Sequence, residues 1–142
     1  MAMHTVRIGK NNKDIYLVFD LLDADLHTVI RAGICTNEQR KFILWQLARA
    51  TLYIHSGNLL HRDIKPANIL VNQDCSIKMA DFGISKVLKR KGHQNMTDYV
   101  ATRWYRSPEV LLGSPDYGKP ADLWAFGCVI VELYIGQPAF AG

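Results

Sequence analysis

Two long apolar segments, residues 42–54 and 121–135, most constrain the fold of this chain. The sequence before the first segment is typical of a helix start, because Thr36 and Gln39 fit a capping box. Residues 56–57, Ser-Gly, are suited to ending that helix. Both segments are apolar on most of their helical faces, so we expect two buried helices.

Short β-type runs surround these helices. Residues 5–8 and 14–19 flank a turn-forming sequence, and this pattern predicts a hairpin. Two further runs, 69–71 and 77–80, flank the polar turn Asn-Gln-Asp. Residues 81–108 have no regular pattern, and so long an irregular stretch within a compact domain is usually functional or disordered. The pattern predicts a mixed α and β domain.

Asp25 introduces a further, short element. Its carboxylate is suited to cap a helix that runs to Ala32, with Gly33 as the stop. The helix would lie between the predicted hairpin and the first long helix.

Composition restricts the class of protein. A chain of 142 residues with 49% apolar and 21% charged residues is typical of at most one globular domain. The net charge of +4 comes from scattered basic residues without interleaved aromatics, so no nucleic-acid partner is expected. The longest apolar run, 123–131, is too short to cross a membrane, and no signal peptide is indicated.

The three cysteines, Cys35, Cys75 and Cys128, lie far apart in the sequence. Their number and spacing support neither a zinc site nor a disulfide framework. We therefore expect buried or half-buried free thiols in a reducing compartment, that is, in the cytoplasm, the nucleus or both.

Groups suited to phosphoryl transfer are concentrated in residues 61–68 and at Asp81. Asp63 can accept the proton of an attacking hydroxyl, and Lys65 can place an ammonium near the transferred group. Asn68 and Asp81 offer the oxygen ligands that Mg²⁺ prefers. The alternative, a polar tight turn, does not require these four residues together.

The sequence resembles the protein kinase family through three motifs in order: His61-Arg62-Asp63, Asp81-Phe82-Gly83 and Ser107-Pro108-Glu109. The resemblance implies a protein-kinase-like α+β fold, ATP and Mg²⁺ as cofactors, and a catalytic base at Asp63. It implies that Lys65 is the lysine typical of serine/threonine kinases. Asn68 and Asp81 match the magnesium ligands. Two further residues match supporting positions: Thr102, which would brace the base, and Asp122, which would anchor the catalytic-loop backbone. His61 would have a structural role.

Thr97-Asp98-Tyr99, shortly before Arg103, resembles the activation lip of MAP kinases in the CMGC group. The resemblance implies phosphorylation of Thr97 and Tyr99 by an upstream kinase or by autophosphorylation. Phosphates there would order the loop through arginines: Arg62 would meet phospho-Thr97, and Arg103 and Arg106 would meet phospho-Tyr99. It also implies protein substrates with Ser-Pro or Thr-Pro. Other stretches are similar to the atypical extracellular-signal-regulated branch.

Residues 16–22 resemble the strand and hinge that hold adenine in kinases. By this resemblance the hinge hydrogen bonds would come from the Asp20 carbonyl and from the backbone of Leu22. Asp25 would reach the ribose and Leu70 would lie beneath the adenine. The alternative is a plain buried strand followed by a helix cap. The implied domains are residues 1–20 as the end of the N-lobe, 21–24 as the hinge and 25–142 as C-lobe.

The sequence departs from the family pattern because it contains neither a Gly-x-Gly-x-x-Gly loop nor a Val-Ala-x-Lys strand. We therefore expect a truncated fold, with an N-lobe hairpin remnant and an incomplete, mainly α-helical C-lobe. In kinases that lysine is needed for activity, so the isolated chain should be inactive. The alternative is a non-catalytic, partner-binding or regulatory module. A small-molecule phosphotransferase is disfavoured, because such an enzyme needs no Thr-x-Tyr lip.

Overall fold

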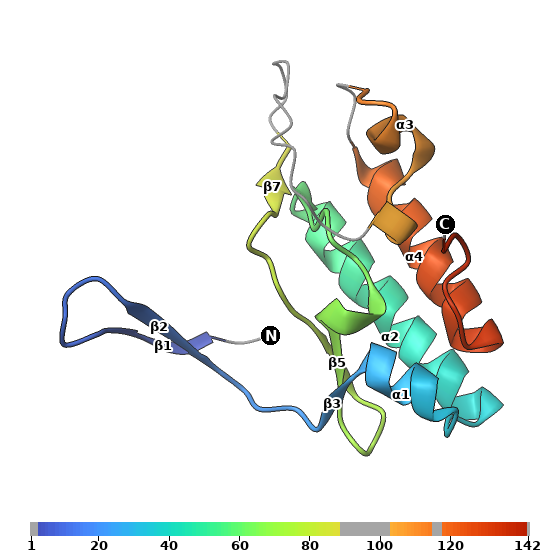
Figure 1. The fold of residues 1–142 in the computed structure, drawn as a ribbon, viewed down its shortest axis with the longest axis horizontal. Helices are drawn as coiled ribbons and strands as arrows, with labels where there is room; N and C mark the ends of the chain where they lie inside the picture. The colour runs from blue at the N-terminus through green and yellow to red at the C-terminus, as the bar shows by residue number, and fades with distance from the viewer. Residues whose placement is uncertain (1–2, 89–102, 115–117, 142) are drawn as a thin grey trace.

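The computed structural model describes residues 3–88, 103–114 and 118–141 (Figure 1). The elements form an α+β fold, as the sequence predicts. The helices are α1 (Leu26–Ala32), α2 (Asn37–Ser56), α3 (Pro108–Leu111) and α4 (Lys119–Ile135), with 3-10 turns at Pro66–Asn68 and Arg103–Tyr105. The strands are β1 (Met3–Ile8), β2 (Ile15–Phe19), β3 (Ala24–Asp25), β4 (Leu59–Leu60), β5 (Ile69–Val71), β6 (Ile77–Met79) and β7 (Lys86–Val87).

The predicted N-terminal hairpin is confirmed. Strands β1 and β2 pair antiparallel, with Ile8 opposite Ile15, and the Gly9 N–H donates to the Asp14 carbonyl at 2.8 Å to close the turn. Every residue of both strands is exposed, and the hairpin projects away from the helices (Figure 1). The apolar side chains of this hairpin therefore contribute little to the core.

Helix α1 begins and ends as predicted. The Asp25 carboxylate accepts the Thr28 N–H at 2.7 Å, so it satisfies a backbone donor that the first helical turn leaves unpaired. At the other end Gly33 has a φ of 64° and donates to the Ile30 carbonyl. A residue without a Cβ adopts this left-handed conformation at little cost, which explains the glycine.

The capping box of α2 is confirmed, because Thr36 and Gln39 exchange side-chain and backbone hydrogen bonds. The expected burial on most faces of α2 is wrong. A single stripe is buried, and Leu52 on another face is 70% exposed. Partly buried apolar side chains flank that stripe, whereas others on the helix are exposed. The buried stripe consists of Ile43, Leu47, Thr51 and His55.

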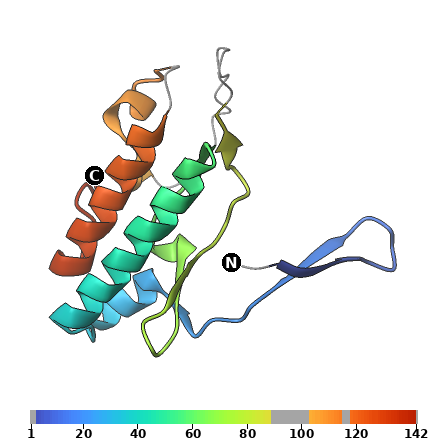
Figure 2. The same ribbon diagram turned by 180° about the vertical axis from the view of Figure 1, so that it is seen from behind.

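Helix α4 lies beside α2 in both views (Figures 1 and 2). Its buried face includes Ala125, Val129 and Leu133, which join the main hydrophobic cluster. The prediction of a buried helix is only partly right, since Leu123 and Ile135 remain more than half exposed. Each long helix therefore has one buried face and one exposed face, although its sequence is apolar on most faces.

A three-stranded sheet in the order β3-β5-β6 packs beside α1 and α2, and β4 pairs with β7. Both pairings within the three-stranded sheet are antiparallel, and the second joins Ile69 to Met79. These short strands hold the ends of the loop 61–68 and of the segment that begins at Asp81. In the part of the chain that the structure describes, no helix is long and apolar enough to cross a membrane.

Candidate active site

The loop between β4 and β5 is anchored to α4 by one buried carboxylate. Asp122 is 1% exposed and accepts the backbone N–H groups of His61 and Arg62, each at 2.9 Å. A third bond, at 2.8 Å, joins Asp122 to Nε2 of His55 on α2. Charged acceptors of this kind form stronger hydrogen bonds than neutral ones. The loop backbone, including Arg62 with its φ of 71°, is thereby fixed against both long helices.

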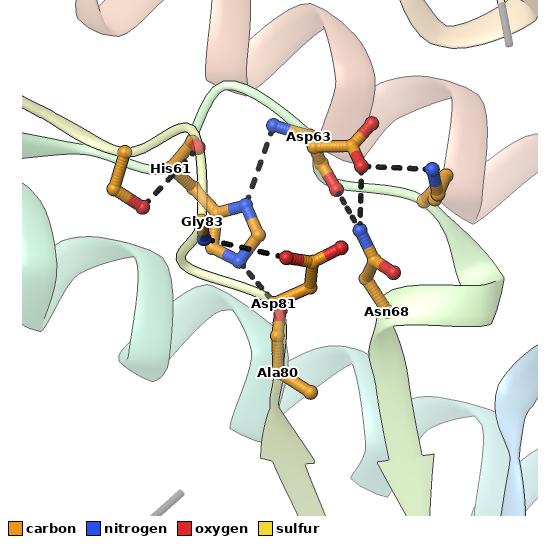
Figure 3. Close-up of polar contacts among 8 residues, drawn as sticks. His61, Asp63, Asn68, Ala80, Asp81 and Gly83 are labelled. Carbon is orange, nitrogen blue, oxygen red and sulfur yellow. Dashed lines mark hydrogen bonds and ion pairs between the residues drawn. The ribbon is translucent and has the colours of Figure 1, made fainter. Parts of the chain in front are cut away.

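Asp63, Lys65 and Asn68 form one polar cluster on this loop (Figure 3). Lys65 Nζ and Asn68 Nδ2 each lie 2.8 Å from the same oxygen, Oδ2 of Asp63. Asn68 Nδ2 also donates to the Asp63 carbonyl at 2.8 Å. The Oδ1 atom of Asp63 takes part in none of these bonds. The cluster therefore holds a carboxylate in a fixed orientation, with one oxygen left to face a reactant.

The start of the next segment lies beside this cluster. The Ala80 N–H donates to the Asn68 carbonyl at 2.9 Å, which ties the residue before Asp81 to the loop. Asp81 has a φ of 59°, and its carboxylate accepts the Gly83 N–H at 3.3 Å. Figure 3 shows the Asp81 carboxylate on the side of the site where Asn68 lies. Sequence positions 13 residues apart are thus brought together.

His61 has the structural role that the sequence suggested. Its side chain is fully buried and packs against the Phe82 ring, with centroids 4.6 Å apart. The Asp63 N–H donates to Nδ1 at 3.3 Å, so Nε2 carries the hydrogen that reaches the Ala80 carbonyl at 3.0 Å. Burial lowers the pKa of His61 below its ordinary value of 6.5, against the opposing effect of Asp122. A neutral imidazole therefore links the two halves of the site.

The residues fit a magnesium ion. Asn68 uses its amide nitrogen for the bonds to Asp63, which leaves its oxygen for a ligand, and Asp81 contributes a carboxylate. Mg²⁺ usually keeps several waters and takes only one or two carboxylates, together with substrate phosphates. A dense acidic cluster is not required, and the described residues contain no group of three or more His, Cys, Asp or Glu placed to hold a metal.

The predicted nucleotide-binding residues lie in the chain that leads from β2 through β3 and on the neighbouring strand β5. Asp20 and Leu22 belong to the connection between β2 and β3, and Asp25 lies opposite Leu70 in the β3–β5 pairing. The carboxylate of Asp25 is engaged in capping α1. The assignments of the backbone groups to adenine and of Asp25 to ribose stay predictions.

Sequence reasoning missed a role for the Asp20 side chain. Its carboxylate lies 2.6 Å from Nε2 of His4 and forms a close ion pair with Lys78 on β6. The hydrogen bond from Lys78 is the main cause that holds the pKa of Asp20 below its ordinary value, and the bond to His4 acts in the same direction. The connection after the hairpin is thereby joined to the three-stranded sheet. The signal in the sequence was a lone lysine in an otherwise apolar strand.

The predicted activation-loop residues Thr97, Tyr99 and Thr102 lie outside the described residues, so the predicted pairing of Arg62, Arg103 and Arg106 with phosphates is not tested. Arg62 Nη1 donates to the Ile84 carbonyl at 3.2 Å. Arg103 begins a 3-10 turn, and the Arg106 N–H donates to its carbonyl.

The 3-10 turn Arg103–Tyr105 is joined to α4 by Tyr105, whose hydroxyl donates to the buried Glu132 at 2.7 Å. Burial, followed by this bond, raises the pKa of Tyr105.

A loop held by Asp122 thus carries Asp63, Lys65 and Asn68 on the side of the site where Asp81 lies. The family model for the protein kinase domain matches residues 3–142. The chain is 48% identical over 139 residues to mitogen-activated protein kinase 15 of Xenopus laevis, covering 94% of the chain and 24% of that protein. It is 48% identical over 131 residues to mitogen-activated protein kinase 2 of Arabidopsis thaliana, covering 92% and 35%.

A third relative is mitogen-activated protein kinase 15 of Caenorhabditis elegans. The alignment, 150 residues long with its gaps, is 46% identical and covers the whole chain and 32% of that protein. The chain belongs to the protein kinase family, and these three relatives are named as MAP kinases. It spans about a quarter to a third of the length of these curated relatives.

Proposed function

We propose that this chain carries the catalytic loop of a serine/threonine protein kinase of MAP kinase type. The enzyme transfers the γ-phosphoryl group of ATP to serine or threonine hydroxyls of protein substrates, at sites followed by proline. The observation that carries the proposal is the fixed Asp63 carboxylate, with Lys65 and Asn68 both on Oδ2 and Oδ1 left for the substrate hydroxyl.

Asp63 acts as the group that positions the attacking hydroxyl and accepts its proton. Lys65 donates to the Asp63 carboxylate in this structure, and its ammonium is suited to counter negative charge on the transferred phosphoryl group. Asn68 and Asp81 would hold Mg²⁺, which neutralises charge on the phosphates when it is bound. The hydrogen bonds to Asp122 fix the loop backbone. This fixation matters for the rate, because a displacement of about 1 Å can cost about a hundredfold.

The MAP kinase names of the relatives and the Thr97-Asp98-Tyr99 motif support the narrower proposals. These are proline-directed substrates, control by phosphorylation of Thr97 and Tyr99 through an upstream kinase or autophosphorylation, and a site of action in the cytoplasm, the nucleus or both.

The test is ATP-dependent phosphorylation of a Ser-Pro or Thr-Pro peptide, with and without Mg²⁺. Two proteins are compared: residues 1–142 alone, and a form extended by whatever native reading frame flanks them. We expect magnesium-dependent activity in the extended form, and loss of that activity on Asp63→Ala. A matched Ser-Ala peptide measures the preference for proline.

Residues 1–142 alone should be inactive, because no lysine strand or Gly-rich loop is present in them to hold ATP phosphates from above. Phosphorylation of the peptide by this chain would contradict that expectation. If an extended form with Thr97 and Tyr99 phosphorylated is also inactive, the catalytic proposal is wrong and the partner-binding alternative replaces it.

A further inference from the structure

A cavity of about 370 Å³ lies between helices α2 and α4, which run side by side in Figures 1 and 2. In the part of the chain that the structure describes, its wall comes from residues 48–56 of α2 and 119–126 of α4. Ligand pockets span about 300–1,000 Å³, so this cavity suits one small molecule. The side chains of Asp63, Lys65, Asn68 and Asp81 are not part of the wall, so the cavity is separate from the phosphotransfer site.

Two rows of apolar side chains form most of the wall. Ala48 and Leu52 come from α2, and Leu123 and Phe126 come from α4. Within each row the residues are three or four positions apart, so they share one helix face. Leu52 is 70% exposed and Leu123 is 54% exposed, so water covers a surface that an apolar ligand would dry.

The polar side chains on the α2 side of the cavity already have partners. The hydroxyls of Thr51 and Ser56 each donate to a carbonyl about one turn earlier in α2, at 2.9 and 2.7 Å. His55 is 7% exposed, and its Nε2 lies 2.8 Å from the Asp122 carboxylate. These three residues therefore add little unsatisfied polarity to the cavity.

Lys119 supplies a positive charge at one end of the cavity. It is half-buried, and it forms no ion pair with any residue that the structure describes. It is also the first residue of α4, where no side chain caps the helix and the helix dipole adds partial positive charge. Asp122, the acid of this first turn, is not part of the wall and accepts from His55, His61 and Arg62.

We propose that this cavity binds an aromatic monocarboxylate with two fused rings. The rings lie between the apolar rows of α2 and α4, and the carboxylate pairs with the Lys119 ammonium at the start of α4. A flat, rigid ring system is favoured over an acyl chain, because it loses less conformational freedom on binding. The charge at Lys119 selects an anion over a neutral or cationic ligand with the same rings. This site is independent of the proposed phosphoryl transfer.

Three indole compounds with the same ring system test the proposal: indole-3-acetate, indole-3-acetamide and tryptamine. Each is titrated into isotope-labelled residues 1–142, below the protein concentration at which light scattering detects association. The backbone amide signals of residues 48–56 and 119–126 report binding at this cavity. With about a dozen non-hydrogen atoms, indole-3-acetate should bind with a dissociation constant of about 1 mM.

The carboxylate should bind about fivefold more tightly than the amide, because a partly exposed ion pair and a helix N-terminus each contribute modestly. Tryptamine, which carries a cation in place of the carboxylate, should bind most weakly. Added salt should reduce the preference for the carboxylate, since it screens the charge of Lys119.

Variants separate the charge from the apolar wall. Lys119→Met keeps an unbranched side chain and should make the carboxylate and the amide bind equally. Lys41→Met, the same change at an exposed position of α2, should keep the fivefold preference. Leu52→Asn should weaken both ligands alike, because it changes the wall and not the charge, whereas Leu21→Asn, at a 98% exposed residue outside both helices, should weaken neither.

Three results would overturn the proposal. The first is equal binding of carboxylate and amide by the unaltered chain, and the second is a fivefold preference that persists in Lys119→Met. The third is that neither ligand shifts the signals of residues 48–56 and 119–126. If light scattering then shows that the chain associates even at the lowest concentration, a second copy of the chain is the occupant of this cavity.

Discussion

The Asp122 carboxylate accepts the backbone N–H of His61 at 2.9 Å, although 61 residues separate them in the sequence. The position of the loop 61–68 therefore depends on helix α4. Asp122→Asn should lower the free energy of unfolding by about 3 kcal/mol, because an amide nitrogen would face a buried donor. Urea unfolding followed by circular dichroism measures this change.

Glu38→Gln is the matched control for Asp122→Asn. It makes the same change of carboxylate to amide at an exposed position in the first turn of α2. Only the weak interaction with the helix dipole is affected, so a loss of about 0.5 kcal/mol is expected. Equal losses in the two variants would show that the Asp122 clamp does not stabilise the loop.

Asp63→Asn should reduce the turnover of a Ser-Pro peptide by about a hundredfold to ten-thousandfold in the extended form of the protein. The amide keeps the shape of the side chain, but it is a far weaker proton acceptor and repels the donors on Lys65 and Asn68. Asp74→Asn, in the exposed turn after β5, controls for the chemical change. Undiminished turnover in Asp63→Asn would remove Asp63 from the reaction.

Stability should fall as the pH is lowered from about 7 to 5, in part through His61. Burial lowers its pKa in the folded state below 6.5, so the unfolded chain binds more protons in this range. The contribution is complete above the unfolded value and is lost as the pH falls through the folded value. The slope from a single group is at most about 1.4 kcal/mol per pH unit.

His61→Gln tests this assignment, because glutamine can still donate to the Ala80 carbonyl and does not titrate. The variant should be less stable at pH 7, but its melting temperature should depend less on pH than that of the wild type. Identical pH slopes would assign the acid sensitivity to other groups.

Lys78→Met should loosen the connection between the β1–β2 hairpin and the three-stranded sheet. The substitution keeps an unbranched side chain on β6 but removes the ion pair with Asp20. Because the hairpin strands are exposed, few other contacts hold this connection. Backbone hydrogen exchange around residues 20–23 should accelerate several-fold. The control is Lys41→Met, the same change at an exposed position of α2. Unchanged exchange would mean that the Asp20–Lys78 pair does not restrain the connection.

Local features of the fold were readable from the sequence because they depend on a few neighbouring residues. The caps at Thr36 and Gly33 and the hairpin turn are of this kind, and the structure has all of them. Asp63, Lys65 and Asn68 were predicted to act together, since phosphoryl transfer requires a base, a cation and an oxygen ligand close together. The structure places the three side chains in one cluster, and their catalytic roles stay predictions. The bond from Asp122 to the loop was implied only by the family resemblance.

Other features depend on contacts that no local pattern encodes. The Asp20–Lys78 pair joins residues 58 positions apart, and the bond from His55 to Asp122 joins α2 to α4. The exposed faces of α2 and α4 were mistaken for buried ones, because an apolar sequence shows which surface favours burial but not whether a neighbour covers it.

The exposed apolar faces of α2 and α4 should make the isolated chain self-associate. Leu52 lies with Leu123 and Phe126 around the cavity between these helices, and Leu52 is 70% exposed. Large contiguous apolar surfaces favour association in water. Leu52→Lys should therefore raise the concentration at which the chain associates several-fold, as measured by light scattering. The control is Leu21→Lys, the same change at a 98% exposed residue outside both helices. If both variants raise that concentration equally, added charge and not this face governs association.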